Sequence, residues 1–271
     1  MTHPVVGVVG AGRMGRPIIG HLARKGFVVH VCDIDSAKRS QVEAQGALWS
    51  DDVVALARAS DVILVCVGYD HELRELLGNP AVVEAAGRGA IFAILSTVNP
   101  RTVQSLAGEG ARHGIVVVDA TMCRGGKAAD EGTLLCFVGG DEATVQRLRP
   151  VLAAFASDIV HTGAVGSAQV AKASNNLILW ACLVANHEGL ALAQRFGLDA
   201  EKLRQALLES SACNDALEKW GTQTMAWAQD DMNIVAQMAD EVGLSLPQSG
   251  VVREICRTLK PRRYDLEKYG R

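Results

Sequence analysis

The stretch VVGVVGAGRMGRPIIGHLA, residues 5–23, decides the fold of this chain. A run of β-branched apolar residues leads into Gly10-Ala11-Gly12-Arg13-Met14-Gly15, and a helical pattern follows. The first glycine of this loop permits a tight turn, the second lets the backbone approach a pyrophosphate, and the third lets helix and strand pack closely. Because the first amides of the helix face the phosphates, the loop is predicted to bind a dinucleotide.

An acidic residue at the end of the next apolar run supports this interpretation. Asp33 lies eighteen positions after Gly15, where a carboxylate can bind the adenosine ribose and repel a 2′-phosphate. The sequence therefore predicts NAD as the cofactor, with NADP as the less favoured alternative, which nearby Lys38 and Arg39 keep open. The other interpretation is a tight turn that binds no nucleotide, with Asp33 as a solvated loop acid.

Further apolar runs in the N-terminal half alternate with helical stretches and occupy residues 28–32, 62–67, 91–95 and 115–119. Continuous apolar runs of this length predict parallel strands that helices cover on both faces. Ser50 and the Asn99-Pro100 pair are predicted to begin two of these helices. The fold class is therefore α/β, with a Rossmann-type doubly wound sheet as the N-terminal domain, residues 1–162.

The pattern of the C-terminal half is helical. Residues 167–196 contain no proline and one glycine, Gly189, enough for about 45 Å of helix at 1.5 Å per residue. Three later stretches also have helical periodicity and capping residues, at 198–211, 230–243 and 247–260.

These patterns predict a long interdomain helix over residues 163–196 and an all-helical substrate and oligomerisation domain over residues 197–271. Within that domain, Trp220 and Trp227 are expected to fill the helical core, and the alternative is that they line a reshaped pocket. We expect the charged end, residues 261–271, to be loosely attached.

The composition excludes several classes of function. The chain is 49% hydrophobic and 21% charged with a net charge of −3, and no basic block favours nucleic acid or anionic lipid as a partner. It has no uninterrupted apolar run of the roughly 18 residues that a membrane span needs, and no pattern of a secretory signal. Its seven cysteines and seven histidines are scattered, so we expect reduced thiols, a cytoplasmic location and no metal site.

The chain resembles the beta-hydroxyacid dehydrogenase family, which includes 3-hydroxyisobutyrate dehydrogenases and tartronate semialdehyde reductases. Four segments match the family's signatures in order: VGVVGAGRMGRPIIGHLARKGFVVHVCD (6–33), LSTVNP (95–100), VDATMCRGGKAADEGTLLCFVGG (118–140) and GAVGSAQVAKASNN (163–176). The resemblance implies hydride transfer between NAD and the alcohol carbon of a small anionic β-hydroxy acid. It also implies cofactor contacts at Val67 and Thr97, and a homodimer or homotetramer.

The resemblance assigns catalysis to Lys172, with Asn176 one helical turn further on. Residues four apart share a helix face, so an ammonium and an amide can meet at one substrate oxygen. Lys172 would take the hydroxyl proton during oxidation or return it during reduction, and Asn175 is a further candidate substrate contact. The other interpretation is a snorkelling lysine beside two asparagines that make local polar contacts.

Two positions depart from the family. Its usual Ser-Gly-Gly is Cys123-Arg124-Gly125 here, which is similar to sulfolactaldehyde reductases, and a guanidinium can bind carboxylate, sulfonate or phosphonate in a bidentate manner. Cys123 is interpreted as a small pocket-lining replacement for serine. Where the family has Lys-Asp, this chain has Asp230-Asp231, and Asp230 is a further candidate substrate contact. We expect Arg124 to replace the lost cation from the opposite wall of the site; the alternative for Arg124 is a surface ion pair.

Two other functions stay open at this point. Imine reductases share the architecture but commonly lack the family lysine, so Lys172 argues against that function, whereas the acidic pair beginning at Asp230 could favour an amine substrate. A catalytically silent NAD-binding regulator is the alternative from another class.

Overall fold

The computed structural model describes residues 3–270. The chain divides into two compact units, unit 1 (Met1–Lys172) and unit 2 (Ala173–Arg271). The boundary falls within helix α9 (Ser167–Arg195), the helix that the sequence assigned to the link. The predicted domain bounds after residues 162 and 196 lie on either side of this point and stay a prediction.

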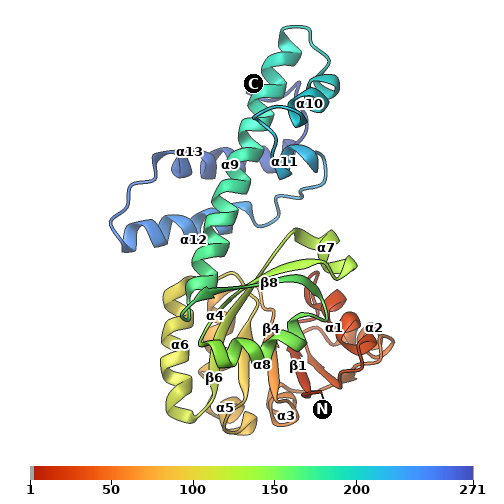
Figure 1. Cartoon of the computed structure of the whole chain (residues 1–271), viewed down its shortest axis with the longest axis vertical. Coiled ribbons are helices and arrows are strands. Elements are labelled where there is room, and N and C mark those ends of the chain that lie inside the picture. Colours follow the sequence, from red (N-terminus) through yellow and green to blue (C-terminus); the bar gives the residue numbers. More distant parts are fainter. Residues whose placement is uncertain (1–2, 271) are drawn as a thin grey trace. The chain divides into compact units, whose positions relative to one another are not determined.

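The described part of unit 1 contains an eight-stranded sheet in the order β3-β2-β1-β4-β5-β6-β7-β8 (Figure 1). The strands are β1 (Val6–Val9), β2 (Val29–Cys32), β3 (Leu48–Trp49), β4 (Val62–Val65), β5 (Ile91–Ile94), β6 (Val116–Cys123), β7 (Leu134–Gly139) and β8 (Ala156–Gly163). The order reverses between β1 and β4, and at such a switch point open α/β sheets bind ligands beyond the carboxyl ends of the strands. The prediction of a doubly wound α/β domain is confirmed.

One part of the sheet was not predicted. The runs at 28–32, 62–67 and 91–95 form parallel strands as expected, but β6 continues to Cys123 and pairs with β7 in the antiparallel direction. The run at 115–119 also pairs in parallel, with β5, so the antiparallel pairing belongs to β7, a strand that was not predicted. The sequence analysis also did not predict β3, β7 or β8.

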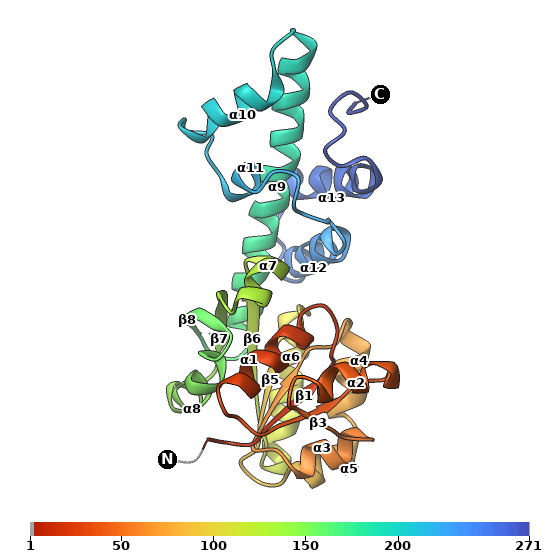
Figure 2. The ribbon, with the colours of Figure 1, turned by 90° about the vertical axis from the view of Figure 1, so that its right-hand side faces the viewer.

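Helices cover both faces of the sheet (Figure 2). One face packs against α1 (Gly15–Arg24), α2 (Arg39–Glu43), α7 (Gly125–Glu131) and α8 (Glu142–Leu152). The other packs against α3 (Val53–Arg58), α4 (Asp70–Leu77), α5 (Pro80–Ala86) and α6 (Pro100–His113). Because successive strand residues point to opposite faces, Ile91 and Ala93 join the first core, whereas Phe92 and Ile94 join the second.

The two predicted helix starts differ in outcome. Asn99 caps α6 as expected, since its side-chain oxygen accepts the N–H of Arg101 at 2.8 Å. Ser50 does not cap α3. The N-cap is Asp52, which accepts the N–H of Ala55 at 2.7 Å, because Ser50 continues the pairing of β3 and donates its N–H to the carbonyl of Val31.

The described part of unit 2 is all-helical, as predicted. After the continuation of α9 come α10 (Ala200–Leu208), α11 (Asp215–Glu218), α12 (Ala228–Glu241) and α13 (Pro247–Leu259). By length and composition alone α9 could cross a membrane, since an 18-residue window reaches a mean hydropathy of 1.2. Core helices of soluble proteins pass the same test, and Trp180, Leu183 and Val184 of α9 lie in the core of unit 2.

The charged C-terminal end is fastened to α9, contrary to expectation. His187 is fully buried; its Nδ1 donates to the carbonyl of Leu183 at 2.7 Å, and its Nε2 accepts the N–H of Tyr264 at 2.9 Å. Desolvation lowers the pKa of His187, in keeping with a neutral ring that must accept one bond.

The two tryptophans differ in their surroundings. Trp220 packs on His187 as a core residue. Trp227 is 50% exposed, so the expectation of core filling is wrong for Trp227.

Candidate active site and family membership

The glycine loop lies at the carboxyl end of β1. Gly10 has φ +98°, and a Cβ there would collide with the carbonyl oxygen of Cys66. A Cβ on Gly15 would collide with the carbonyl oxygen of Gly10. A Cβ on Gly12, in contrast, would meet nothing within 4 Å. The fold itself therefore requires Gly10 and Gly15, whereas the open space at Gly12 fits a cradle for a group from outside the chain.

Asp33 is hydrogen-bonded to this loop. Its side chain is 5% exposed; it accepts the N–H of Ala11 at 2.6 Å, and both its oxygens lie 3.0 Å from Nζ of Lys38. Burial opposes ionisation of Asp33, but backbone N–H groups and Lys38 outweigh it and hold the pKa below its ordinary value. Asp33 is thus a buried carboxylate and not a solvated loop acid. Lys38 offsets part of the charge that was expected to repel a 2′-phosphate, so this ion pair weakens the predicted preference for NAD over NADP.

The remaining loop residues have different surroundings. Ala11 is buried, and Met14 packs against the core. Arg13 forms a two-bond ion pair with Asp130 of α7, at 2.8 and 2.6 Å. This pair joins the glycine loop to helix α7, which begins at Gly125.

The segments after β4 and β5 meet at the same end of the sheet. Ser96 Oγ donates to the carbonyl of Val67 at 2.8 Å, and Ser96 directly precedes Thr97. Since β4 and β5 pair in parallel and β4 is next to β1, the carboxyl ends of these strands bring the predicted cofactor contacts Val67 and Thr97 to the edge where the glycine loop begins.

Strand β6 and helix α9 bring two predicted residues together. Nζ of Lys172 lies 4.0 Å from Sγ of Cys123; Lys172 is half-buried, and Cys123 is buried. One turn further along α9, Asn176 is 3% exposed and its side-chain oxygen accepts a bond from Nδ2 of Asn175 at 3.0 Å. Asp230, at the start of α12 in unit 2, is exposed.

Arg124 occupies a backbone conformation that glycine usually adopts. Its φ is 81° and its ψ is 0°, a left-handed conformation that costs a non-glycine residue about 1 kcal/mol or more. Gly125 follows with φ 75°. The guanidinium Nη1 lies 2.6 Å from Oδ2 of Asp158 and 2.9 Å from Oγ of Ser157. Hydrogen bonds that Asp158 accepts from Arg124 and Ser157 hold the pKa of Asp158 below its usual range. In this structure Arg124 therefore makes the surface ion pair that the sequence left as the alternative.

Two family profiles cover nearly the whole chain. Residues 5–163 match the NAD-binding domain of 6-phosphogluconate dehydrogenase. Residues 166–267 match the NAD-binding domain of NADP-dependent 3-hydroxyisobutyrate dehydrogenase. The chain belongs to the beta-hydroxyacid dehydrogenase family. The chain is therefore an oxidoreductase with NAD(P)-binding domains.

Individual relatives support the same assignment. The chain is 29% identical over 262 residues to 2-(hydroxymethyl)glutarate dehydrogenase of Eubacterium barkeri, and the match covers 92% of this chain and 87% of the relative. Its fold matches Mycobacterium tuberculosis 3-hydroxyisobutyrate dehydrogenase with L-serine, at a TM-score of 0.88 and 24% identity over 96% of this chain and 94% of that one. Psf3 in complex with NADP+ and 2-OPP matches with a TM-score of 0.84 and 25% identity, covering 96% and 95%.

The architecture is also that of imine reductases. An imine reductase from Myxococcus stipitatus in complex with NAD+ matches with a TM-score of 0.72 and 19% identity, covering 97% of this chain and 95% of that one. At this identity the likeness concerns the fold alone.

Sequence reasoning missed three buried polar residues of the dehydrogenase, Asp119, Thr121 and Gln169. Asp119 and Thr121 bond backbone groups in the first turn of α9, and Gln169 is itself a residue of that turn. The signal that could have revealed two of them is the spacing of Asp119 and Thr121, because polar residues two apart in an apolar strand share one face. Among residues 3–270, no group of three or more His, Cys, Asp or Glu side chains is placed to hold a metal.

A substitution at Arg124 separates the two roles considered for it. If Arg124 binds the substrate anion, Arg124→Ala should raise KM about tenfold, because a hydrogen bond to a charged group contributes about 1.5–3 kcal/mol, and Asp158→Asn should leave KM unchanged or lower it. We expect this result from steady-state kinetics. If KM stays at the wild-type value in both variants while Tm falls equally, Arg124 is a surface ion pair only.

Proposed function

We propose that this protein transfers a hydride between NAD and the alcohol carbon of a small anionic β-hydroxy acid, or reduces the matching aldehyde or keto acid. Lys172 is the proposed general acid and base. The observation that carries the proposal is the position of Lys172, which belongs to the fourth family signature while its Nζ lies 4.0 Å from Sγ of Cys123 in the third. L-serine, named with the M. tuberculosis relative, is itself a β-hydroxy acid and supports this substrate class.

The residues of the chain fit an NAD(P) cofactor, which when bound supplies the hydride acceptor or donor at its nicotinamide. The loop from Gly10 to Gly15 would hold the pyrophosphate, since Gly12 faces open space. Asp33 would lie beside the ribose, and Val67 and Thr97 would line the nicotinamide end.

Lys172 would perform the proton chemistry, and Asn176 would hold the substrate oxygen. In oxidation, neutral Nζ of Lys172 takes the proton of the substrate hydroxyl; in reduction, the ammonium returns a proton to the same oxygen. The side-chain oxygen of Asn176 already accepts a bond from Asn175, so Nδ2 is the group that would donate to the substrate oxygen. Cys123, Arg124 and Gly125 would receive the anionic group of the substrate.

The experiment is a screen of alcohols that carry a carboxylate, sulfonate or phosphonate, each with NAD and with NADP, read as absorbance of the reduced nicotinamide. We expect turnover of at least one β-hydroxy acid, with kcat/KM about tenfold higher for NAD, a difference of about 1.4 kcal/mol. Both cofactors are tested because Lys38 lies 3.0 Å from Asp33.

Other results would contradict the proposal. Cofactor binding without turnover of any alcohol would favour a silent NAD-binding regulator. Reduction of cyclic imines in the absence of hydroxy-acid turnover would favour an imine reductase, the alternative that the exposed acid Asp230 and the shared fold keep open.

A further inference from the structure

Strand β6 presents three side chains in series to the start of helix α9. Asp119, Thr121 and Cys123 alternate along β6 and so share one face. Asp119 accepts the N–H groups of Gly166 at 2.8 Å and Gln169 at 2.9 Å. Thr121 donates its hydroxyl to the carbonyl of Ala168 at 3.0 Å, and Cys123 lies 4.0 Å from Lys172. Because Asp119 and Thr121 are fully buried, water cannot replace these bonds without cost.

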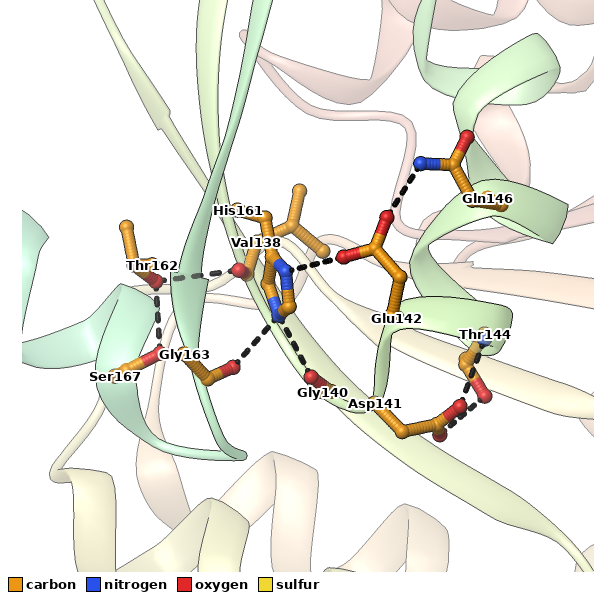
Figure 3. Close-up of polar contacts among 10 residues, drawn as sticks. All are labelled: Val138, Gly140, Asp141, Glu142, Thr144, Gln146, His161, Thr162, Gly163 and Ser167. Atoms are coloured by element: carbon orange, nitrogen blue, oxygen red, sulfur yellow. Dashed lines mark hydrogen bonds and ion pairs between the residues drawn. The ribbon is translucent and has the colours of Figure 1, made fainter.

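The carboxyl end of β8 lies directly before α9 and also contributes to the start of this helix. Figure 3 shows His161 between the carbonyls of Gly140 and Gly163, with Nε2 at 2.8 and 3.0 Å, while Nδ1 donates to Glu142 at 2.9 Å. The hydrogen bonds to the Gly140 carbonyl and to Glu142 raise the pKa of His161, because the ring can donate from both nitrogens only when it is protonated. Next to His161, the hydroxyl of Thr162 donates to the carbonyl of Val138 in β7 at 3.2 Å and lies 2.7 Å from the hydroxyl of Ser167, the first residue of α9. Hydrogen bonds to β6 and β8 therefore hold the helix start, and β8 is bonded in turn to β7.

Gln169 also links the start of α9 to the segment between β5 and α6. It is 1% exposed. Its Nε2 donates to the carbonyl of Ser96 at 2.8 Å, and its Oε1 accepts the N–H of Val98 at 3.0 Å. The two backbone groups flank Thr97, so one side-chain amide binds both sides of this residue. Lys172 lies three residues after Gln169, one turn further along the same helix.

We propose that Gln169 is a positioning residue for hydride transfer: its amide fixes Thr97, on the cofactor-side segment, relative to Lys172, the proton-transfer residue. This inference rests on the proposed function. Chemistry that joins hydride and proton transfer needs both partners in place, and a misplacement of about 1 Å can cost about 100-fold in rate. Gln169 touches neither substrate nor cofactor in this role, because it acts through the backbone on either side of Thr97.

The test compares three variants. Gln169→Met keeps a similar side-chain volume but removes both hydrogen bonds. Gln169→Glu restores one donor and one acceptor only while its carboxyl is protonated. Gln104→Met is the matched control, because Gln104 is an exposed glutamine of α6 that donates to the carbonyl of Val165 just before α9, at 3.2 Å.

For Gln169→Met we expect kcat to fall about 30-fold, with a much smaller change in KM, while Gln104→Met stays within about threefold of the wild type. The activity of Gln169→Glu relative to wild type should rise as the pH is lowered from about 8 to about 6, because burial favours the protonated carboxyl. In the cofactor-free protein, hydrogen exchange of residues 95–100 should be faster in Gln169→Met than in Gln104→Met.

Two results would overturn this role for Gln169. One is equal kcat in Gln169→Met and Gln104→Met; the other is unchanged exchange of residues 95–100 together with a flat pH ratio for Gln169→Glu. If Gln169→Met does not fold, the pH ratio and the exchange of Gln169→Glu decide the question. Failure of the proposed function is distinguished by the wild type, which would then show no hydroxy-acid turnover, whereas the exchange measurement needs no turnover.

Discussion

Replacing Lys172 by alanine is expected to lower kcat/KM for the β-hydroxy acid about 1000-fold, because a positioned general acid or base typically contributes between about 100- and 10,000-fold. Cofactor affinity should stay near the wild-type value, since the predicted NAD contacts lie on the glycine loop and on the segments after β2, β4 and β5. Lys172 is half-buried in the second turn of α9, and alanine is a good helix former. Thermal stability should therefore change little.

Two further variants make the Lys172 result specific. Lys172→Arg keeps the positive charge, but a guanidinium does not give up its proton in proteins, so we expect it to be nearly as inactive as the alanine variant. Lys127→Ala on α7 is the control. The side chain of Lys127 is 86% exposed, so its replacement should leave turnover unchanged. Near-normal turnover in both Lys172 variants would show that Lys172 is a snorkelling lysine of the helix.

The features that the sequence predicted are those with a local origin. The strand, the glycine loop and the first helix are consecutive in the chain, so spacing alone identifies Gly10 and Gly15 as residues that the backbone needs. The long helix α9 was predicted to within a residue of its end for the same reason. Helical and strand periodicities depend on neighbours a few residues apart.

The features that the sequence could not predict depend on contacts between distant segments. The pairing of β6 with β7 continues to Cys123, past the polar residues Asp119 and Thr121, which in a single sequence look like the end of a strand. Their burial makes sense only once α9 supplies the backbone groups that they bind. Polar groups of this kind are buried because they are paired.

The sequence also could not predict the partners of long charged side chains. The sequence singled out Asp33 by its spacing from the glycine loop, but this spacing did not show that Lys38 pairs with the same carboxylate. Likewise, the sequence located Arg124 beside two glycines, but it could not choose between a substrate anion and Asp158 as its partner. Both choices depend on the rotamers of long side chains, which spacing does not determine.

The glycine loop provides the second large expected effect. Gly12→Val should weaken NAD binding by at least about 3 kcal/mol, roughly 150-fold, because the added side chain would occupy the open space where the pyrophosphate would approach. The unfolding midpoint should stay close to that of the wild type, since a Cβ at Gly12 meets nothing within 4 Å. Calorimetric titration with NAD and thermal unfolding measure the two quantities separately.

Two glycine variants provide the comparison that makes the Gly12 result meaningful. Gly15→Ala should lose stability as well as NAD binding, because its Cβ would collide with the carbonyl oxygen of Gly10. Gly108→Ala on α6 should leave NAD binding unchanged, since a Cβ there also meets open space and alanine favours the helix. If Gly12→Val binds NAD as tightly as Gly108→Ala, the loop does not approach the cofactor, and the glycines serve only the turn between β1 and α1.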